Sequence, residues 1–291
     1  MTGAPAIDAL GDVHGDVAAT ARILSAAGLI TTSTPFHWTG GNRILVVTGD
    51  VIDKGTAALP IIDLLITLES EASAAGGRVV VTLGNHEAEF LADPTDSKSD
   101  VFQAELQSRN LDPKKVAAGD TTYGAWLLTR PVAALIDGWF FSHAGNSGGM
   151  SAAVIARTFE QLVDAPVSNG GRSRFDDPFL IGPSSLLEQQ VWWKTTGTTP
   201  TTVIDVNLAA LPAQHIVFGH DPGAITFPDD PQGDRARGQM AFRYDGRLGL
   251  IDVGMSSAVG YSPGALLRIA RGASDQATAL FANGTSEVLW P

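Results

Sequence analysis

Residues 6–16, AIDALGDVHGD, decide the fold of this chain because a short apolar strand, expected at 6–10, runs directly into a glycine-bounded polar turn. The same order returns in ILVVTGDVIDKG at 44–55 and in RVVVTLGNHE at 78–87. Between these stretches, residues 17–27 and 58–75 have the apolar spacing of helices. Strand, loop and helix in repeated order predict parallel strands joined by crossover helices.

Polar side chains follow each of the three apolar stretches. Ligands of open parallel sheets bind beyond the carboxyl ends of the strands, and all three turns are expected there. We therefore expect one cluster formed by Asp12, His14, Asp50, Asn85 and His86. Carboxylate, imidazole and amide ligands at one point are what a two-metal hydrolase needs to activate water beside a phosphate. A single carboxylate, that of Asp50, could bridge both metals.

The rest of the chain predicts a second sheet. Strand-like stretches at 132–136 and 139–142 lead to His143, and 216–219 leads to His220, so both histidines could complete a second metal site. Further strands are expected at 240–244, 248–253 and 265–269. Together these stretches predict an α/β fold with two sheet layers and helices outside.

We expect one domain over residues 1–291 with two additions to the sheets. Residues 88–123 are polar and helical in pattern, and they directly follow GNHE, so they predict a helical insertion that covers the site. Residues 164–185 contain Gly-Gly, Asp-Pro and Gly-Pro pairs and predict a long irregular loop.

Composition excludes several classes of protein. A formal net charge of −12 argues against an extended basic surface for nucleic acid, and the absence of cysteine excludes disulfides and thiolate ligands. The sequence contains no run of about 18 apolar residues, which a membrane-spanning helix would need. The first strand begins too early for a signal peptide, so we expect a cytoplasmic protein, or a secreted or periplasmic one if a leader was removed. Oligomeric state is not readable.

Some acidic and histidine side chains have simpler explanations. Asp16 precedes the first helix and is expected to cap its N-terminus. His37 and His215 are expected to be ordinary polar or partly buried histidines. The other four histidines each follow an apolar stretch and lie within two residues of Gly or Asn, which favours roles as ligands or in catalysis.

Five motifs in order carry a family resemblance: GDVHGD (11–16), GDVIDKG (49–55), GNHE (84–87), SHAG (142–145) and FGH (218–220). They resemble the calcineurin-like metallophosphoesterases, and within these the bacterial Shewanella-like members of the phosphoprotein phosphatase branch. The segments YGAWLLTRPVAALIDGWFFSHAG and IDVGMSS are also similar to that group. The resemblance implies an α/β/β/α sandwich of two mixed sheets flanked by helices.

The resemblance also implies roles for individual residues. It implies that the first metal is held by Asp12, His14 and Asp50, and the second by Asp50, Asn85, His143 and His220. His86 is implied to protonate the leaving alkoxide, with Asp53 to orient it. Two divalent ions are implied, with manganese favoured and iron, zinc or another transition metal as alternatives, because the ligands are oxygen and nitrogen.

Substrate contacts depart from the family pattern. Leu83 and Lys54 stand where many relatives carry arginine, and lysine cannot make the planar two-pronged grip of arginine on phosphate. Other cationic candidates, each with solvent exposure as the alternative, are Lys194, Arg172 and Arg174. Asp252 in IDVG is expected to support a ligand histidine or to cap a turn.

These observations predict a metallophosphatase that hydrolyses phosphomonoesters of a small molecule or a phosphoprotein. A hydroxide that bridges the two metals would attack phosphorus directly. An alternative enzyme is a dinucleoside polyphosphate hydrolase or phosphodiesterase. An alternative of another class is a non-catalytic metal-binding interaction protein, against which the intact His86 and Asp53 argue.

Overall fold

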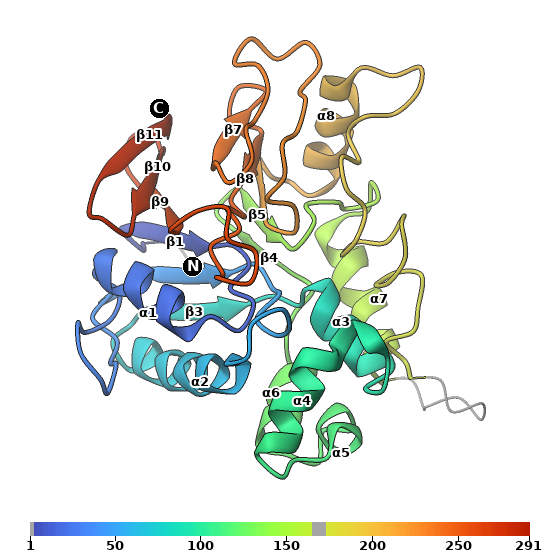
Figure 1. Cartoon of the computed structure of the whole chain (residues 1–291). Helices are drawn as coiled ribbons and strands as arrows, with labels where there is room; N and C mark the ends of the chain where they lie inside the picture. Colours follow the sequence, from blue (N-terminus) through green and yellow to red (C-terminus); the bar gives the residue numbers. More distant parts are fainter. Residues whose placement is uncertain (1–2, 165–172) are drawn as a thin grey trace.

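Two mixed β-sheets flanked by helices form the part of the chain that the computed structural model describes, residues 3–164 and 173–291 (Figure 1). The strands of the first sheet are β1 (Ala6–Leu10), β2 (Ile44–Val47), β3 (Arg78–Val81), β9 (Ala265–Ala270), β10 (Gln276–Phe281) and β11 (Ser286–Trp290). Those of the second are β4 (Ala133–Ile136), β5 (Trp139–Ser142), β6 (His215–Phe218), β7 (Ala241–Arg243) and β8 (Leu248–Leu250). The spatial orders are β11-β10-β9-β1-β2-β3 and β4-β5-β6-β8-β7. The predicted fold class is confirmed.

Helices connect many of these strands. They are α1 (Val17–Ala26), α2 (Ala58–Ala74), α3 (Asn85–Ala92), α4 (Asp100–Ser108), α5 (Pro113–Ala117), α6 (Thr122–Leu128), α7 (Ala152–Asp164) and α8 (Pro200–Ala210), with a short 3₁₀ turn, η1 (Ser97–Ser99). The carboxylate of Asp16 accepts the N–H of Ala19 at 2.9 Å, which confirms its predicted place as the cap of α1. Within the described residues, the helices are too short or too polar to cross a membrane.

The centre of the first sheet is parallel, as the repeated pattern predicts. β1 pairs with β2, and β2 with β3, in parallel register, while β9 joins the other side of β1 antiparallel. All residues of β1 and β2 are buried, as expected for strands of a sheet covered on both faces. The one charged side chain there, Asp8, is compensated by Arg268 at 2.7 Å and Arg43 at 3.3 Å.

The segment predicted as a helical insertion holds most of α3, then η1, α4 and α5, and reaches the start of α6. Two carboxylates fasten it to the rest of the chain. Glu105 of α4 accepts the first N–H groups of α2, those of Ala58 at 2.8 Å and Leu59 at 2.9 Å. Asp53 accepts the N–H of Phe102 at 3.0 Å. The insertion is thereby held against the loop that carries the second motif.

The predicted irregular loop is described only in part. Asp164 ends α7, and residues 165–172 lie outside the described residues. Residues 173–185 form turns and bends without a helix or strand. Phe175 and Leu180 of this part are buried, so the loop contributes to the core.

Candidate metal centre

The carboxyl ends of strands from both sheets meet at one place. Asp12 and His14 follow β1, Asp50 follows β2, and Asn85 follows β3 at the start of α3. From the second sheet, His143 follows β5 and His220 follows β6. Hydrogen bonds lock the two sheets together here: His143 Nδ1 contacts the Thr48 carbonyl at 2.7 Å, and His220 N–H donates to Asp12 Oδ1 at 3.0 Å.

Three side chains form the first group of predicted ligands. His14 Nε2 lies 3.7 Å from Asp12 Oδ2 and 3.5 Å from Asp50 Oδ2. The other ring nitrogen of His14, Nδ1, lies 3.1 Å from the carbonyl of Ile52. Donation from Nδ1 to that carbonyl leaves the lone pair of Nε2 directed at the two carboxylates.

Four side chains form the second group. The oxygen Oδ1 of Asn85 lies 2.9 Å from His143 Nε2 and 3.1 Å from His220 Nδ1. Asp50 Oδ1 lies 3.3 Å from His143 Nε2. The far nitrogen of His220 lies 3.2 Å from the Glu188 carbonyl, which leaves its Nδ1 for the cluster. Asp50 therefore presents one oxygen to each group, as a shared ligand must.

The residues present fit divalent cations. Asp12 Oδ2 is buried and has no hydrogen-bond partner, so a cation beside it would satisfy an otherwise uncompensated carboxylate oxygen. Burial and the neighbouring carboxylate of Asp252 raise the pKa of Asp12 well above its usual value. The donors are oxygen and imidazole nitrogen without thiolate, which suits manganese, iron or zinc.

The imidazoles have very different proton affinities. Burial lowers the pKa of His14 to about 3, and burial together with the charge of His143 lowers that of His220 to about 3. Burial also opposes protonation of His143, but the carboxylates of Asp50 and Asp12 outweigh it and raise its pKa to about 10. The pKa values of these three histidines therefore differ because carboxylates outweigh burial only at His143, whereas the charges of Lys54 and His86 add to the effect of burial at His14.

His86 is held differently from the predicted ligand histidines. Its Nδ1 lies 3.3 Å from the carboxylate of Asp53 rather than against a backbone carbonyl, and its Nε2 lies 3.9 Å from Asp50 Oδ2. Burial opposes protonation of His86, but Asp50 and the hydrogen bond that the ring donates to Asp53 raise its pKa overall. By distance alone, His86 could also act as a ligand beside His14 and Asp50.

The turns that carry the cluster have unusual backbone geometry. Several residues other than glycine have a positive φ, among them His14 (39°), Asp50 (50°), Asp53 (62°), Lys54 (59°) and His220 (70°). This left-handed conformation costs free energy for side chains with a Cβ atom. Close packing adds to the constraint, because a Cβ atom at Gly84 or Gly219 would collide with the carboxylate of Asp50 or Asp12.

Glu87 belongs to the site, although the sequence analysis assigned it no role. Its buried carboxylate accepts the backbone N–H groups of Asp50 at 2.9 Å, Val51 at 2.8 Å, Ile52 at 3.1 Å and Gly84 at 2.8 Å. One side chain thus joins the loop that carries Asp50 to the start of α3. The available signal was its position three residues after the cap of a helix, where Glu commonly reaches back to the cap.

Replacing Glu87 with Gln should weaken metal binding about 10- to 100-fold. An amide has one oxygen and cannot accept four N–H groups, so the loop of Asp50 would lose its fixed position. Isothermal titration with Mn²⁺ measures the change. Glu105→Gln is the matched control, because Glu105 also accepts two backbone N–H groups but lies on α4. Wild-type metal affinity in Glu87→Gln would contradict this role.

The predicted phosphate contacts differ in whether they lie at the cluster. The Lys54 amine lies at the cluster, 2.8 Å from His14 Nε2. Arg174 donates to the carbonyl of Val163 at the end of α7. Lys194 is exposed, and no contact joins it to the predicted ligands within 3–164 and 173–291. Arg172 lies outside the described residues. Of the three that the structure describes, only Lys54 is placed beside the cluster.

Asp252 makes no hydrogen bond to a ligand histidine among the described residues. Its Oδ1 accepts the N–H of Gly254 at 2.8 Å, the contact expected of a turn cap. Burial raises the pKa of Asp252 to about 6. Asp252 acts on the cluster through its charge, since it contributes to the raised pKa of Asp12.

Comparison with known proteins gives the class that this fold and cluster define. The model of the family described as calcineurin-like phosphoesterase matches residues 6–224 of this chain. The chain therefore belongs to the calcineurin-like phosphoesterase family.

Individual relatives are similar over a short stretch of sequence. An uncharacterised protein of Schizosaccharomyces pombe is 46% identical over 79 residues, which are 27% of this chain and 24% of that protein. Shewanella-like protein phosphatase 2 of Arabidopsis thaliana is 43% identical over 79 residues, 27% of this chain and 20% of that protein. The match spans a quarter or less of the length of these curated relatives.

Solved structures are similar over nearly the whole chain. The cold-active protein-tyrosine phosphatase of a psychrophilic Shewanella species has a TM-score of 0.72 at 22% identity, covering 99% of this chain and 81% of that one. A protein serine/threonine phosphatase from Saccharomyces cerevisiae has a TM-score of 0.62 at 14% identity, covering 100% and 81%. At these identities the likeness shows a common fold.

Proposed function

We propose that this protein is a metal-dependent phosphomonoesterase that acts on phosphorylated proteins. The observation that carries the proposal is the convergence of Asp50, Asn85, His143 and His220 within hydrogen-bond distances, with Asp12 and His14 on the other side of Asp50. The family supports phosphoester chemistry, and the phosphatase names of the relatives support the substrate class. The strongly acidic chain supports a substrate other than nucleic acid.

The chain would hold two divalent ions, one on each side of Asp50. Asp12 and His14 would hold the first, and Asn85, His143 and His220 the second, with manganese favoured. When bound, such ions lower the pKa of water from its ordinary value toward about 7 and neutralise charge on phosphoryl oxygens. The fixed tautomers of His14 and His220 keep the required nitrogen lone pairs directed inward.

His86 would supply the proton that the leaving alkoxide needs. The carboxylate of Asp53 orients the ring through Nδ1, and this leaves Nε2 at the open side of the cluster. His86 is also part of α3, directly after Asn85, so a leaving group at the cluster is within its reach. An imidazolium in contact with a carboxylate is a suitable general acid near neutral pH.

Lys54 would contact the substrate phosphate. Its amine donates to the nitrogen of His14 that we assign to a metal, so metal binding would break this contact. The exposed Lys54 side chain would then have its charge free at the cluster. A single ammonium is a point charge, which allows phosphate to bind in more than one orientation. We further propose that the helices of 88–123, fastened by Asp53 and Glu105, cover this side of the site.

The proposal is tested by hydrolysis assays on the purified chain with and without metal. We expect turnover of para-nitrophenyl phosphate to require Mn²⁺ and to disappear with EDTA. Parallel assays with a phosphoserine peptide, a phosphotyrosine peptide and diadenosine tetraphosphate identify the substrate class. Full activity in EDTA would reject the two-metal site. Exclusive cleavage of diadenosine tetraphosphate would reject the phosphomonoesterase assignment while leaving the metal site intact.

A further inference from the structure

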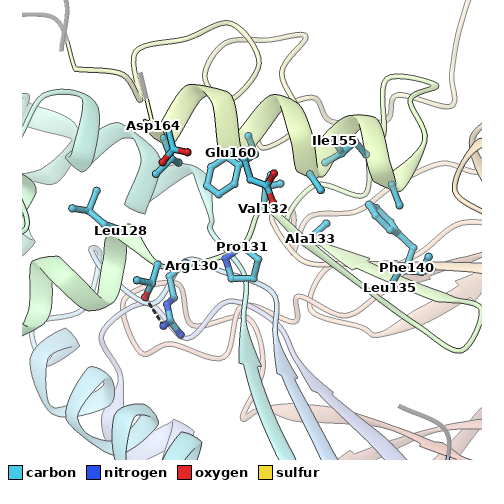
Figure 2. Close-up of a pocket in the computed structure, with 15 residues that line it drawn as sticks. Leu128, Arg130, Pro131, Val132, Ala133, Leu135, Phe140, Ile155, Glu160 and Asp164 are labelled. Atoms are coloured by element: carbon cyan, nitrogen blue, oxygen red, sulfur yellow. Dashed lines mark hydrogen bonds between the residues drawn. The ribbon is translucent and has the colours of Figure 1, made fainter. Parts of the chain in front are cut away.

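A large apolar groove lies between helix α7 and the β4–β5 hairpin (Figure 2). Its volume is about 450 Å³. Ile155 and Phe159 of α7 form one wall, and Leu135 and Phe140 form the other. None of the residues assigned to the metal centre lines it.

The groove opens at the edge of a sheet. β4 is the terminal strand of the second sheet and pairs only with β5 among the described strands. Ala133 and Leu135 line the groove, whereas the intervening Ala134 does not, as expected from the two-residue period of a strand. Leu135 is 40% exposed. A segment added along β4 would therefore direct every second side chain into the groove.

The walls are unevenly charged. Glu160 and Asp164 lie one helical turn apart on α7 and line the groove near Val132 and Leu128 (Figure 2). Neither has an ion-pair partner among residues 3–164 and 173–291. The cation that lines the groove, Arg130, is bound to Glu69 and stacks over Trp126 at 4.2 Å. One end of an otherwise apolar groove is therefore negatively charged.

We propose that this groove is a docking site for an extended peptide segment of a partner protein. The segment would pair with β4, place alternate apolar side chains between α7 and the hairpin, and carry a Lys or Arg that reaches Glu160 and Asp164. The exposed strand edge supplies main-chain partners, the groove selects apolar side chains, and the two carboxylates select a cation.

The groove has a direct connection to the metal centre. The carbonyl of Pro131, which lines the groove, accepts the N–H of Leu83 at 2.8 Å. Leu83 directly precedes the turn that carries Asn85 and His86. A partner docked here would contact Pro131, which is hydrogen-bonded to the segment that leads into the metal centre. This arrangement suits the recruitment of protein substrates.

Selection from a library of random heptapeptides displayed on phage, with the full chain as bait, tests the proposal. We expect enriched peptides with alternating apolar residues and at least one Lys or Arg. The consensus peptide, synthesised with a fluorophore, should bind in anisotropy titrations. A failure to enrich any peptide, or a consensus that is acidic or lacks apolar residues, would overturn the proposal.

Two alanines of α7 provide matched variants for locating the bound peptide. Ala156 lines the groove and Ala153 does not, and both are exposed on the same helix. Ala156→Trp should fill the groove and weaken the consensus peptide at least about tenfold, whereas Ala153→Trp should leave its affinity unchanged. Equal effects of the two substitutions would place the peptide elsewhere and overturn the proposal.

A charge variant separates the acidic end from the apolar walls. The double variant Glu160→Gln, Asp164→Asn keeps the shape of both side chains and should also lower affinity about tenfold, less so at high salt. Thermal unfolding of every variant verifies that the fold is kept. Light scattering tests a second copy as the occupant: a dimer that Ala156→Trp dissociates would replace the partner peptide with self-association. Phosphatase activity is not needed for any of these measurements.

Discussion

Replacing Asp50 with Asn should abolish phosphatase activity, with kcat/KM on para-nitrophenyl phosphate falling at least about 1,000-fold, or about 4 kcal/mol. Asp50 is the carboxylate that faces both ligand groups, with Oδ2 toward His14 and Oδ1 toward His143. The amide keeps the oxygen that accepts the N–H of His86 at 3.1 Å but removes the charge. The loss therefore reports on metal binding rather than on folding.

Metal content and a matched variant distinguish a loss of metal binding from a loss of folding. Elemental analysis should find less than two ions per chain in Asp50→Asn. Asp245→Asn is the control, because Asp245 has a similar left-handed backbone, with φ of 57° against 50°, and lies in the turn between β7 and β8. We expect the control to keep full activity. An Asp50→Asn protein within tenfold of wild-type activity and with two bound ions would contradict the shared-ligand assignment.

His86→Ala should lower kcat by about 10²- to 10⁴-fold on a phosphoserine peptide and much less on para-nitrophenyl phosphate. An alkoxide is a poor leaving group and needs a proton, whereas nitrophenolate leaves without one. The difference between the two substrates is the signature of a proton donor. Loss of a phosphate-binding contact would lower both rates equally.

The same variant settles which role His86 has. A proton donor can be removed without loss of metal, whereas removal of a ligand releases an ion. His86→Ala should therefore retain both ions. His37→Ala is the matched control, because exposed His37 also contacts a carboxylate through Nδ1, that of Glu71 at 2.7 Å. Loss of an ion in His86→Ala would assign His86 to the first metal, as its distance from Asp50 allows.

The parallel strands of the first sheet were predictable because a turn that contains Gly follows each of them. Residues 6–10 and 139–142 were predicted with the limits that the structure shows, and 17–27 and 58–75 end within one residue of α1 and α2. The runs at 6–10, 17–27 and 58–75 each stop at Gly, whose turn marks the boundary, whereas 139–142 ends at Ser142 before His143. The cluster at the strand ends followed from the same pattern.

Several elements were not predicted although turn residues bound some of them, as Asn283 and Gly284 do between β10 and β11. β10 and β11 follow the last predicted strand, and β11 is largely exposed, so it lacks the alternation of a half-buried strand. α8 contains Thr and Val residues that also favour strands, although Thr199 caps it and Pro200 begins it. α7 carries Ile155, Phe159 and Leu162 at helical spacing, so its sequence contains an apolar face although the helix was not predicted.

Parts of the site depended on three-dimensional contacts that spacing cannot show. Motifs placed Asp12, His14, Asp50 and Asn85 correctly at strand ends, but the four N–H groups that Glu87 accepts come from two different motifs. Lys194 and Arg174 were predicted as cationic contacts, and the structure gives neither a contact with the cluster. A cationic side chain on a loop has no periodicity that fixes its direction.

The left-handed turns of the cluster have a consequence for how this protein can be altered. Glycine at position 54 would relieve a backbone that the present side chain adopts at a cost, while removing the proposed phosphate contact. Heat resistance and turnover should therefore oppose each other at this position. A screen that selects only for survival at high temperature would enrich inactive variants. Thermal selection of this chain therefore has to be coupled to an assay of phosphate release.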